Sequence, residues 1–244
     1  MILDAATLAR GWLSAFTATS NEPARPQLHK TIFIEQHTHG VRLVATDSYM
    51  LLHTWIPERD YEFDPEPEPE EIPYATAVAI DAHGRGVGLL SHLLKLTKEK
   101  DGELKQLDVT VRLNVEWEPD EPDQTIRLEG FTALAVVIEH PDHERVQLEV
   151  YQGNYPTWQA VLAGVKRSRT EAIGLSAWTA GRLAKAAKVH GDETTIRHYF
   201  GGKDKPVSVS FGEEPEVSGL VMPVKWNMDT NEPWVEPVQT ETED

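Results

Sequence analysis

One order of secondary-structure elements recurs three times along this chain of 244 residues. Each time, the hydrophobic pattern predicts a short strand or its remnant, then one helix, then a meander of strands. The helices are predicted at residues 4–19, 85–100 and 177–191. The three units share no sequence identity, so the repetition lies in the pattern alone. Because such a unit buries its apolar side by stacking against its neighbours, we predict an α+β fold built as an array.

Breaks in this pattern predict two domains and a tail. Residues 1–152 hold two strand–helix–strands units, residues 153–226 hold a shorter third unit, and residues 227–244 form a disordered acidic tail. Residues 58–74 are rich in proline and carry eight acidic side chains and one basic one, so they form an exposed loop. Strands are predicted at about 28–36, 41–55, 75–81, 107–117, 124–130, 131–139, 144–151 and 171–176, and in a last group of three ending with 217–226.

The negative charge of the chain is unevenly distributed. The formal net charge is −17, but residues 166–191 carry six basic side chains and one acidic one. On the helix at 85–100, Lys95 and Lys98 lie opposite a leucine stripe. The helix at 177–191 repeats this arrangement, with Arg182, Lys185 and Lys188 on the side away from a predicted buried stripe of Ala180, Leu183, Ala184 and Ala187. These faces indicate a localised positive surface, although a solvated lysine face is the alternative.

The stretch "VRLVATDSYMLLHT", residues 41–54, places unusual apolar surface directly after a turn. Alternating apolar residues predict a first strand, and the short oxygen-bearing side chains of "TDS" predict a tight turn. Four largely apolar residues follow without a polar residue between them, from Tyr49 to Leu52. Alternate positions of a strand face inward, so about half of them are expected to be ordinary core. The others require a different explanation.

The composition excludes several classes of site. The chain has no cysteine, which removes disulfides, thiolate metal sites and cysteine nucleophiles. It has no apolar run of 18 residues and no signal-peptide pattern at its start, so we predict a cytoplasmic protein. The segment "HGRGVG" resembles a dinucleotide-binding turn, but its glycines are spaced two and two, and Leu89 fills the position that needs glycine.

The histidines and carboxylates do not predict a catalytic site. His37 and His39 form one close pair and His140 and His143 another, but nothing fixes a third metal ligand for either pair. The many carboxylates lie in solvated runs, where burial cannot tune a pKa. We therefore predict no catalytic residue, no metal and no cofactor.

Three segments in chain order carry a resemblance to the bacterial DNA polymerase sliding clamp, the ring-shaped processivity factor. "VRLVATDSYMLLHT" resembles the clamp's "VATDGHRLA" segment, "QGNYPTWQAVL" resembles its "DGRFPDYRRVLP" connector, and "VSGLVMPVKW" resembles its C-terminal "AYVVMPMRL". The resemblance covers residues 1–226 in outline, with letter-level similarity at these three places. It implies the clamp fold, in which helices line the hole of a ring and antiparallel sheets face outward.

The resemblance implies an apolar pocket that binds short hydrophobic peptides of a DNA polymerase and the clamp loader. Its residues here are Thr46, Ser48, Tyr49, Leu51, Pro156, Val161, Leu220, Met222, Pro223 and Val224. Ser48, Tyr49 and Met50 replace the family's glycine, histidine and arginine, which leaves the peptide preference open. A pocket of this kind would explain the exposed apolar residues after the turn.

The resemblance also implies a basic ring interior that attracts duplex DNA without reading its sequence. The implied DNA-facing residues are Arg10, Lys95, Lys98, Lys166, Arg167, Arg182, Lys185 and Lys188. Chain length favours a homo-oligomeric ring of three subunits, as in the clamps of phages, archaea and eukaryotes, and indicates a phage or mobile-element clamp in the cytoplasm of a bacterial host, associated with the nucleoid. A count of three units per chain would instead require four subunits.

Two functions other than a clamp stay open, and so does the role of the tail. The chain is either a non-enzymatic clamp, a peptide-binding module that has kept the pocket and lost the ring, or a nucleotide-binding enzyme built on "HGRGVG". The segment "EPWVEPV" in the tail places Trp234 and Val235 among acidic residues. This segment predicts either a solubilising tail or one that folds back and competes for the chain's own pocket.

Overall fold

The computed structural model describes residues 2–37, 39–59, 77–83, 103–104, 106–116, 127–139, 146–149, 158–164, 173–202, 205–213 and 216–224. The predicted helix at 85–100, most of the acidic loop and the tail lie outside these residues. So do the candidate site residues Lys95, Lys98, Pro156, Lys166 and Arg167.

Two helices form where the sequence predicts them. Helix α1 spans Ala5–Thr17, and the Asp4 side chain caps it by accepting a hydrogen bond from the backbone N–H of Thr7 at 2.7 Å. Helix α4 spans Ala177–Lys188 and is capped in the same way by Ser176. Beyond its last turn, Gly191 adopts a φ of +133°, a conformation that favours glycine. The predicted start and stop of this helix are therefore confirmed.

Twelve strands and two further helical segments complete the described part of the chain. They are β1 (Leu3–Asp4), η1 (Gln27–Lys30), β2 (Thr31–His37), β3 (Gly40–Thr46), β4 (Met50–Pro57), β5 (Ala77–Asp81), β6 (Glu103–Leu104), β7 (Gln106–Glu116), β8 (Arg127–Glu139), β9 (Val146–Glu149), α3 (Trp158–Ala163), β10 (Arg197–Phe200), β11 (Val207–Phe211) and β12 (Val217–Val221).

Two strand predictions are wrong. The described parts of the strands predicted at 124–130 and 131–139 form one strand, β8, because β7 pairs with it from end to end, with two register shifts on the way. Of the strand predicted at 171–176, the described residues 173–176 form only a single bridge, between Gly174 and Val224, and Ser176 serves as the helix cap.

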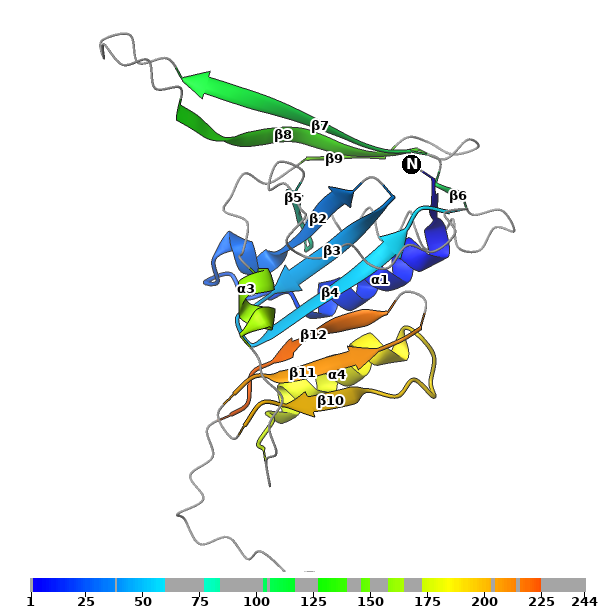
Figure 1. Ribbon diagram of the computed structural model, residues 1–244, viewed down its shortest axis with the longest axis vertical. Coiled ribbons are helices and arrows are strands. Elements are labelled where there is room, and N and C mark those ends of the chain that lie inside the picture. Colours follow the sequence, from blue (N-terminus) through cyan, green and yellow to red (C-terminus); the bar gives the residue numbers. More distant parts are fainter. Residues whose placement is uncertain are drawn as a thin grey trace, which may run out of the picture.

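The main sheet has seven strands in the order β10-β11-β12-β4-β3-β2-β5, and all its neighbours are antiparallel (Figure 1). β12 pairs with β4, so one sheet combines strands from both of the domains predicted at 1–152 and 153–226. That domain division stays a prediction, but its boundary does not separate two sheets. Strands β7, β8 and β9 form a separate three-stranded antiparallel sheet, and β1 pairs with β6.

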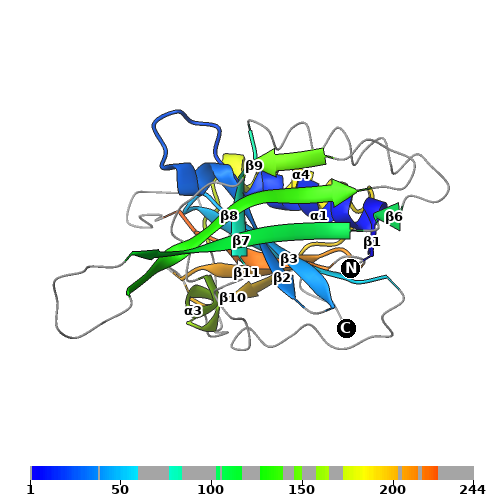
Figure 2. The same ribbon diagram turned by 90° about the horizontal axis from the view of Figure 1, so that it is seen from above.

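The two faces of the main sheet bury different sets of side chains. Ile32, Leu43 and Leu52 pack with the buried faces of α1 and α4 in the larger core. The neighbouring residues of the same strands, Phe33, Val44 and Leu51, belong to a second cluster with Trp158 of α3. Because side chains alternate across a strand, α1 and α4 cover one face of the sheet and α3 lies against the other. Figure 2 shows α3 on the opposite side of the sheet from both long helices.

Candidate functional site

A hydrogen-bonded turn between β3 and β4 exposes Tyr49. The buried carboxylate of Asp47 accepts hydrogen bonds from the backbone N–H groups of Tyr49 and Met50, each at 2.9 Å. Ser48 holds a positive φ of 77°, where the resemblance places a glycine, and its hydroxyl lies 2.9 Å from Nε2 of His29. The turn predicted from "TDS" is therefore confirmed, and it fixes the backbone from which Tyr49 projects.

Arg182 of α4 connects this turn to the end of α1. Its guanidinium forms an ion pair with Asp47 and also donates hydrogen bonds to the carbonyl oxygens of Thr17 and Thr19. The Arg182 side chain is 14% exposed. The prediction that Arg182 belongs to a solvent-facing basic surface is therefore wrong, because its charge is matched by partners inside the protein.

Two aromatic rings and two guanidinium groups form a row next to the turn. The rings of Tyr49 and Trp178 meet edge to face with their centroids 6.5 Å apart. The guanidinium of Arg25 lies 5.1 Å from the centre of the Tyr49 ring, and that of Arg182 lies 4.2 Å from the centre of the Trp178 ring. Both distances are typical of cation–π contacts. Trp178 is not among the docking residues predicted from the sequence, although a tryptophan on the predicted polar side of a helix was a signal for it.

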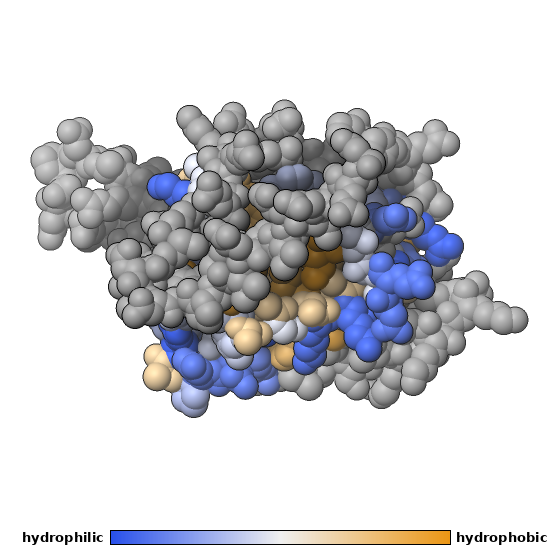
Figure 3. All heavy atoms as spheres, turned by 90° about the horizontal axis from the view of Figure 1, so that it is seen from below, coloured by the Kyte–Doolittle hydropathy of each residue, from blue (hydrophilic) through white to orange (hydrophobic). Residues whose placement is uncertain are grey.

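The residues that follow β12 complete an apolar surface beside this row. The N–H of Met222 donates to the carbonyl oxygen of Tyr49 at 2.8 Å, and the N–H of Val224 donates to Gly174 at 2.8 Å. We name the surface formed by Tyr49, Trp178, Met222 and Val224 the Tyr49–Trp178 surface. Each of these residues exposes between 40% and 57% of its surface. Figure 3 shows the face seen from the β10 side, where apolar residues gather among hydrophilic ones.

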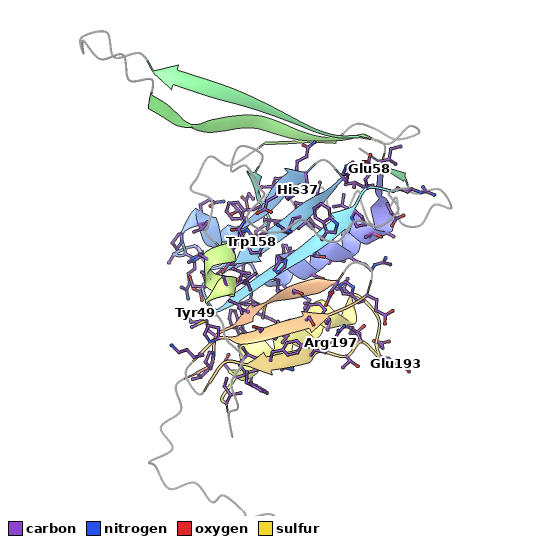
Figure 4. All side chains as sticks on the ribbon, viewed as in Figure 1. His37, Tyr49, Glu58, Trp158, Glu193 and Arg197 are labelled. Atoms are coloured by element: carbon purple, nitrogen blue, oxygen red, sulfur yellow. The ribbon has the colours of Figure 1, made fainter. Side chains whose placement is uncertain are left out.

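The structure brings parts of all three predicted segments to the same end of the sheet. Leu51 and Leu220 face each other across β4 and β12, and they are buried in the cluster that contains Trp158. Val161 of α3 is half exposed. Tyr49 and Trp158 lie toward one end of the sheet, and Glu58 and Glu193 lie toward the other (Figure 4). Leu51 and Leu220 therefore form core, whereas Tyr49, Val161, Met222 and Val224 are available for contact.

A buried ion pair attaches α3 to the face of the sheet opposite α1 and α4. Glu35 and Arg42 are directly opposite each other on β2 and β3, and their side chains approach to 3.2 Å with neither exposed. The second oxygen of the Glu35 carboxylate accepts a hydrogen bond from the indole N–H of Trp158 at 2.8 Å. The Arg42 guanidinium lies 5.1 Å from the Trp158 ring centre. These contacts fix the position of the helix that carries Val161.

The basic face of α4 is smaller than predicted. The buried residues of the helix are Thr179, Leu183, Ala186 and Ala187. Ala180 and Ala184 are exposed, so the predicted stripe is wrong in its phase. Lys185 and Lys188 remain on the surface, where Lys188 pairs with Asp192 at 3.2 Å. Arg10 of α1 is half-buried and donates to the Thr7 hydroxyl at 3.4 Å.

Neither a membrane span nor a metal cluster is found in the described residues. No helix there is long and apolar enough to cross a bilayer, and no three His, Cys, Asp or Glu side chains gather as metal ligands. His37 lies 3.6 Å from Glu35, and His39 lies 4.0 Å from Glu58.

Solved structures of bacterial sliding clamps share this architecture. The DNA polymerase III subunit beta of Pseudomonas aeruginosa matches with a TM-score of 0.56 at 14% identity, over 92% of this chain and 66% of the other. The chain has the sliding-clamp fold. A clamp of Bartonella birtlesii bound to griselimycin matches at 18% identity and a TM-score of 0.54, over 93% and 66%. The Thermotoga maritima beta subunit matches at 12% identity and 0.53, over 93% and 64%.

The chain corresponds to only part of the length of the structures it matches. The chain spans 64% to 66% of the length of those three clamps and of a beta subunit from Eubacterium rectale. Neither a protein-family model nor a curated protein matches the sequence. The similarity is therefore one of fold.

Proposed function

We propose that the protein is a sliding clamp, a non-enzymatic ring of identical subunits that encircles duplex DNA and tethers a DNA polymerase. The observation that carries the proposal is the convergence of three separate segments on one end of the sheet. Tyr49, Val161 and Met222 come from these segments, and all three are exposed. Exposed apolar groups gathered in this way favour a docking site for a hydrophobic peptide of the polymerase or clamp loader.

The proposed DNA-facing surface lies on the helical side of the main sheet. Lys185 and Lys188 are exposed on α4, and the sequence places Lys95, Lys98, Lys166 and Arg167 in other segments. Arg10 adds to this set, whereas Arg182 is engaged inside the protein. Contacts of such side chains with phosphates are independent of base sequence and weaken as salt is raised.

Ring closure would join subunits at the ends of the sheet. In the described part of the chain the main sheet ends at β10 and β5. Pairing these edges between subunits would protect them from aggregation and would close a ring when the rotation between copies is a simple fraction of a turn. A ring of three subunits is proposed, with four as the alternative.

Two measurements on the whole chain test this function. Light scattering across a concentration series should give a stable mass of three or four chains. The protein should be retained on nicked circular DNA and should slide off after the circle is cut. A monomer at every concentration would rule out the ring and leave the peptide-binding module.

A matched pair of charge reversals tests the DNA-facing surface. Lys185→Glu should weaken retention on circular DNA severalfold, because it replaces an attractive charge on the helical side with a repulsive one. Lys205→Glu makes the same change in the β10–β11 connection. This variant should be retained on circular DNA as well as the unchanged chain is. Equal retention by the two variants would remove α4 from the DNA-facing surface.

A further inference from the structure

Next to the apolar residues of the Tyr49–Trp178 surface lies the positive charge of Arg25, whose ionic partner is exposed to solvent. Arg25 lies over the Tyr49 ring and pairs with Glu22 at 3.1 Å, and the Glu22 side chain is 65% exposed. An exposed pair of this kind is weak and exchanges its partner readily. Arg182, in contrast, is neutralised by Asp47. The surface therefore fits an aromatic or aliphatic side chain that is accompanied by a carboxylate directed at Arg25.

The described part of the chain ends on this same surface. Val224 is both the last described residue and a member of the surface. Residues 225–244 follow it, and Trp234 lies ten positions further along. Ten residues span at most about 35 Å when extended, so the segment around Trp234 has enough chain to turn back to the surface.

The tail contains a segment with the chemistry that the surface fits. Residues 227–244 hold six acidic residues and no basic one. Within them, residues 231–238 read "NEPWVEPV", in which Trp234 and Val235 stand together between Glu232 and Glu236. The two prolines favour an extended backbone, which lowers the entropy lost on docking. A tail that served only for solubility would have no use for a tryptophan beside a valine.

We propose that residues 231–238 of the chain's own tail occupy the Tyr49–Trp178 surface and compete there with docking partners. The Trp234 and Val235 side chains pack against Tyr49, Trp178 and Met222, and a neighbouring glutamate takes the place of Glu22 on Arg25. This inference rests on the proposed function, since it supplies a regulator of the same docking site. A tethered segment acts at an effective concentration of about 1 mM, so a free peptide with a Kd of about 0.1 mM would bind roughly tenfold more weakly while the tail is in place.

The test uses full-length protein and a fluorescein-labelled peptide of residues 229–240, with binding followed by anisotropy. The double variant W234A/V235A should bind the peptide about tenfold more tightly than the unchanged chain does. The control Q239A/T240A changes two tail residues outside 231–238 and should bind the peptide as the unchanged chain does. Adding Tyr49→Ala or Trp178→Ala to W234A/V235A should abolish the gain, and both rings are exposed, so these variants are expected to fold.

The outcomes separate this inference from the proposed function. Equal affinity of the unchanged chain and W234A/V235A, or no binding to either, overturns occupancy by the tail. If the same samples retain a ring-sized mass and stay on circular DNA, the clamp function stands without its internal competitor. A monomer that shows the tenfold difference would support the tail contact and overturn the ring.

Discussion

A Cβ atom added to Gly219 would lie 1.9 Å from the carbonyl oxygen of Leu51. The two residues lie on β12 and β4, the strands that join the N-terminal and C-terminal parts of the main sheet. The absence of a side chain at Gly219 therefore allows the two halves of the sheet to pair.

Gly219→Ala should separate these strands and lower the free energy of unfolding by more than about 3 kcal/mol, because the clash is with backbone and cannot be relieved by a rotamer change. Gly181→Ala is the matched control. No atom lies within 4 Å of a Cβ at Gly181, so alanine should stabilise α4 by about 0.5–1 kcal/mol. Urea unfolding measures both changes, and equal stability of the two variants would contradict the role given to Gly219.

The Asp47–Arg182 pair should show strong coupling in a double-mutant cycle. Asp47→Ala or Arg182→Ala alone leaves a charge with little exposure and no ionic partner, which typically costs about 3–5 kcal/mol. The double variant should lose clearly less than the sum of the two single losses. Lys185→Ala on the exposed side of α4 should change stability by less than about 0.5 kcal/mol. Additive losses would show that the two side chains act separately.

Stability should fall as the pH is lowered below neutrality, partly because of His53. Burial, with a smaller contribution from the charge of Arg42, lowers the pKa of His53 to about 3. The unfolded chain, with an ordinary histidine pKa of 6.5, therefore binds a proton between pH 6.5 and 3 that the folded chain excludes. Between pH 7 and pH 5 this histidine should account for a loss of about 2 kcal/mol.

His53→Phe keeps an aromatic ring against Trp158, 4.8 Å from the histidine ring in the native protein, and removes the titration. The difference in unfolding free energy between pH 7 and pH 5 should shrink by about 2 kcal/mol. Burial lowers the pKa of His190 to about 4, so this residue also reduces stability as the pH falls. Part of the pH dependence of stability should therefore remain in His53→Phe. An unchanged pH profile in His53→Phe would contradict the assignment.

Trp158→Phe should affect both stability and docking. It removes the indole donor from the buried carboxylate of Glu35, a loss of about 1–3 kcal/mol, and it loosens the attachment of α3. Val161→Ala removes an exposed side chain from the same helix and should leave stability within about 0.5 kcal/mol. Both variants should weaken binding of the 229–240 peptide to the W234A/V235A chain if α3 borders the occupied surface. Unchanged binding in both would exclude α3 from it.

The parts of the fold that local chemistry determines were predictable from the sequence. Ser176 and Gly191 mark the two ends of α4, and the "TDS" turn lies where its side-chain oxygens indicate. The phase of α4 was not predictable in the same way, because alanines occur on both of its faces and only Leu183 fixes the inward direction. For this reason Ala180 and Ala184 were predicted to be buried, whereas the structure exposes both.

The tertiary partners of charged residues could not be predicted from spacing. Arg182 resembled the neighbouring lysines in the sequence, but its carboxylate partner is 135 positions away. Glu35 and Arg42 alternate with apolar residues in the way that solvent-facing positions do, and Trp158 then covers them from a distant segment. Among the predicted docking residues, exposure separates Tyr49 and Met222 from Leu51 and Leu220, and that distinction depends on how α3 packs.

The pairing of β4 with β12 also determines when folding can be completed during synthesis. The hydroxyl of Thr54 donates to the carbonyl oxygen of Glu216, 162 positions later, at the margin of this pairing. A nascent chain therefore holds β4 as an open strand edge until Val217–Val221 has left the ribosome. Long-range antiparallel pairing of this kind folds slowly and exposes unpaired backbone in the meantime. We expect this interval to be the period in which the protein depends most on chaperones.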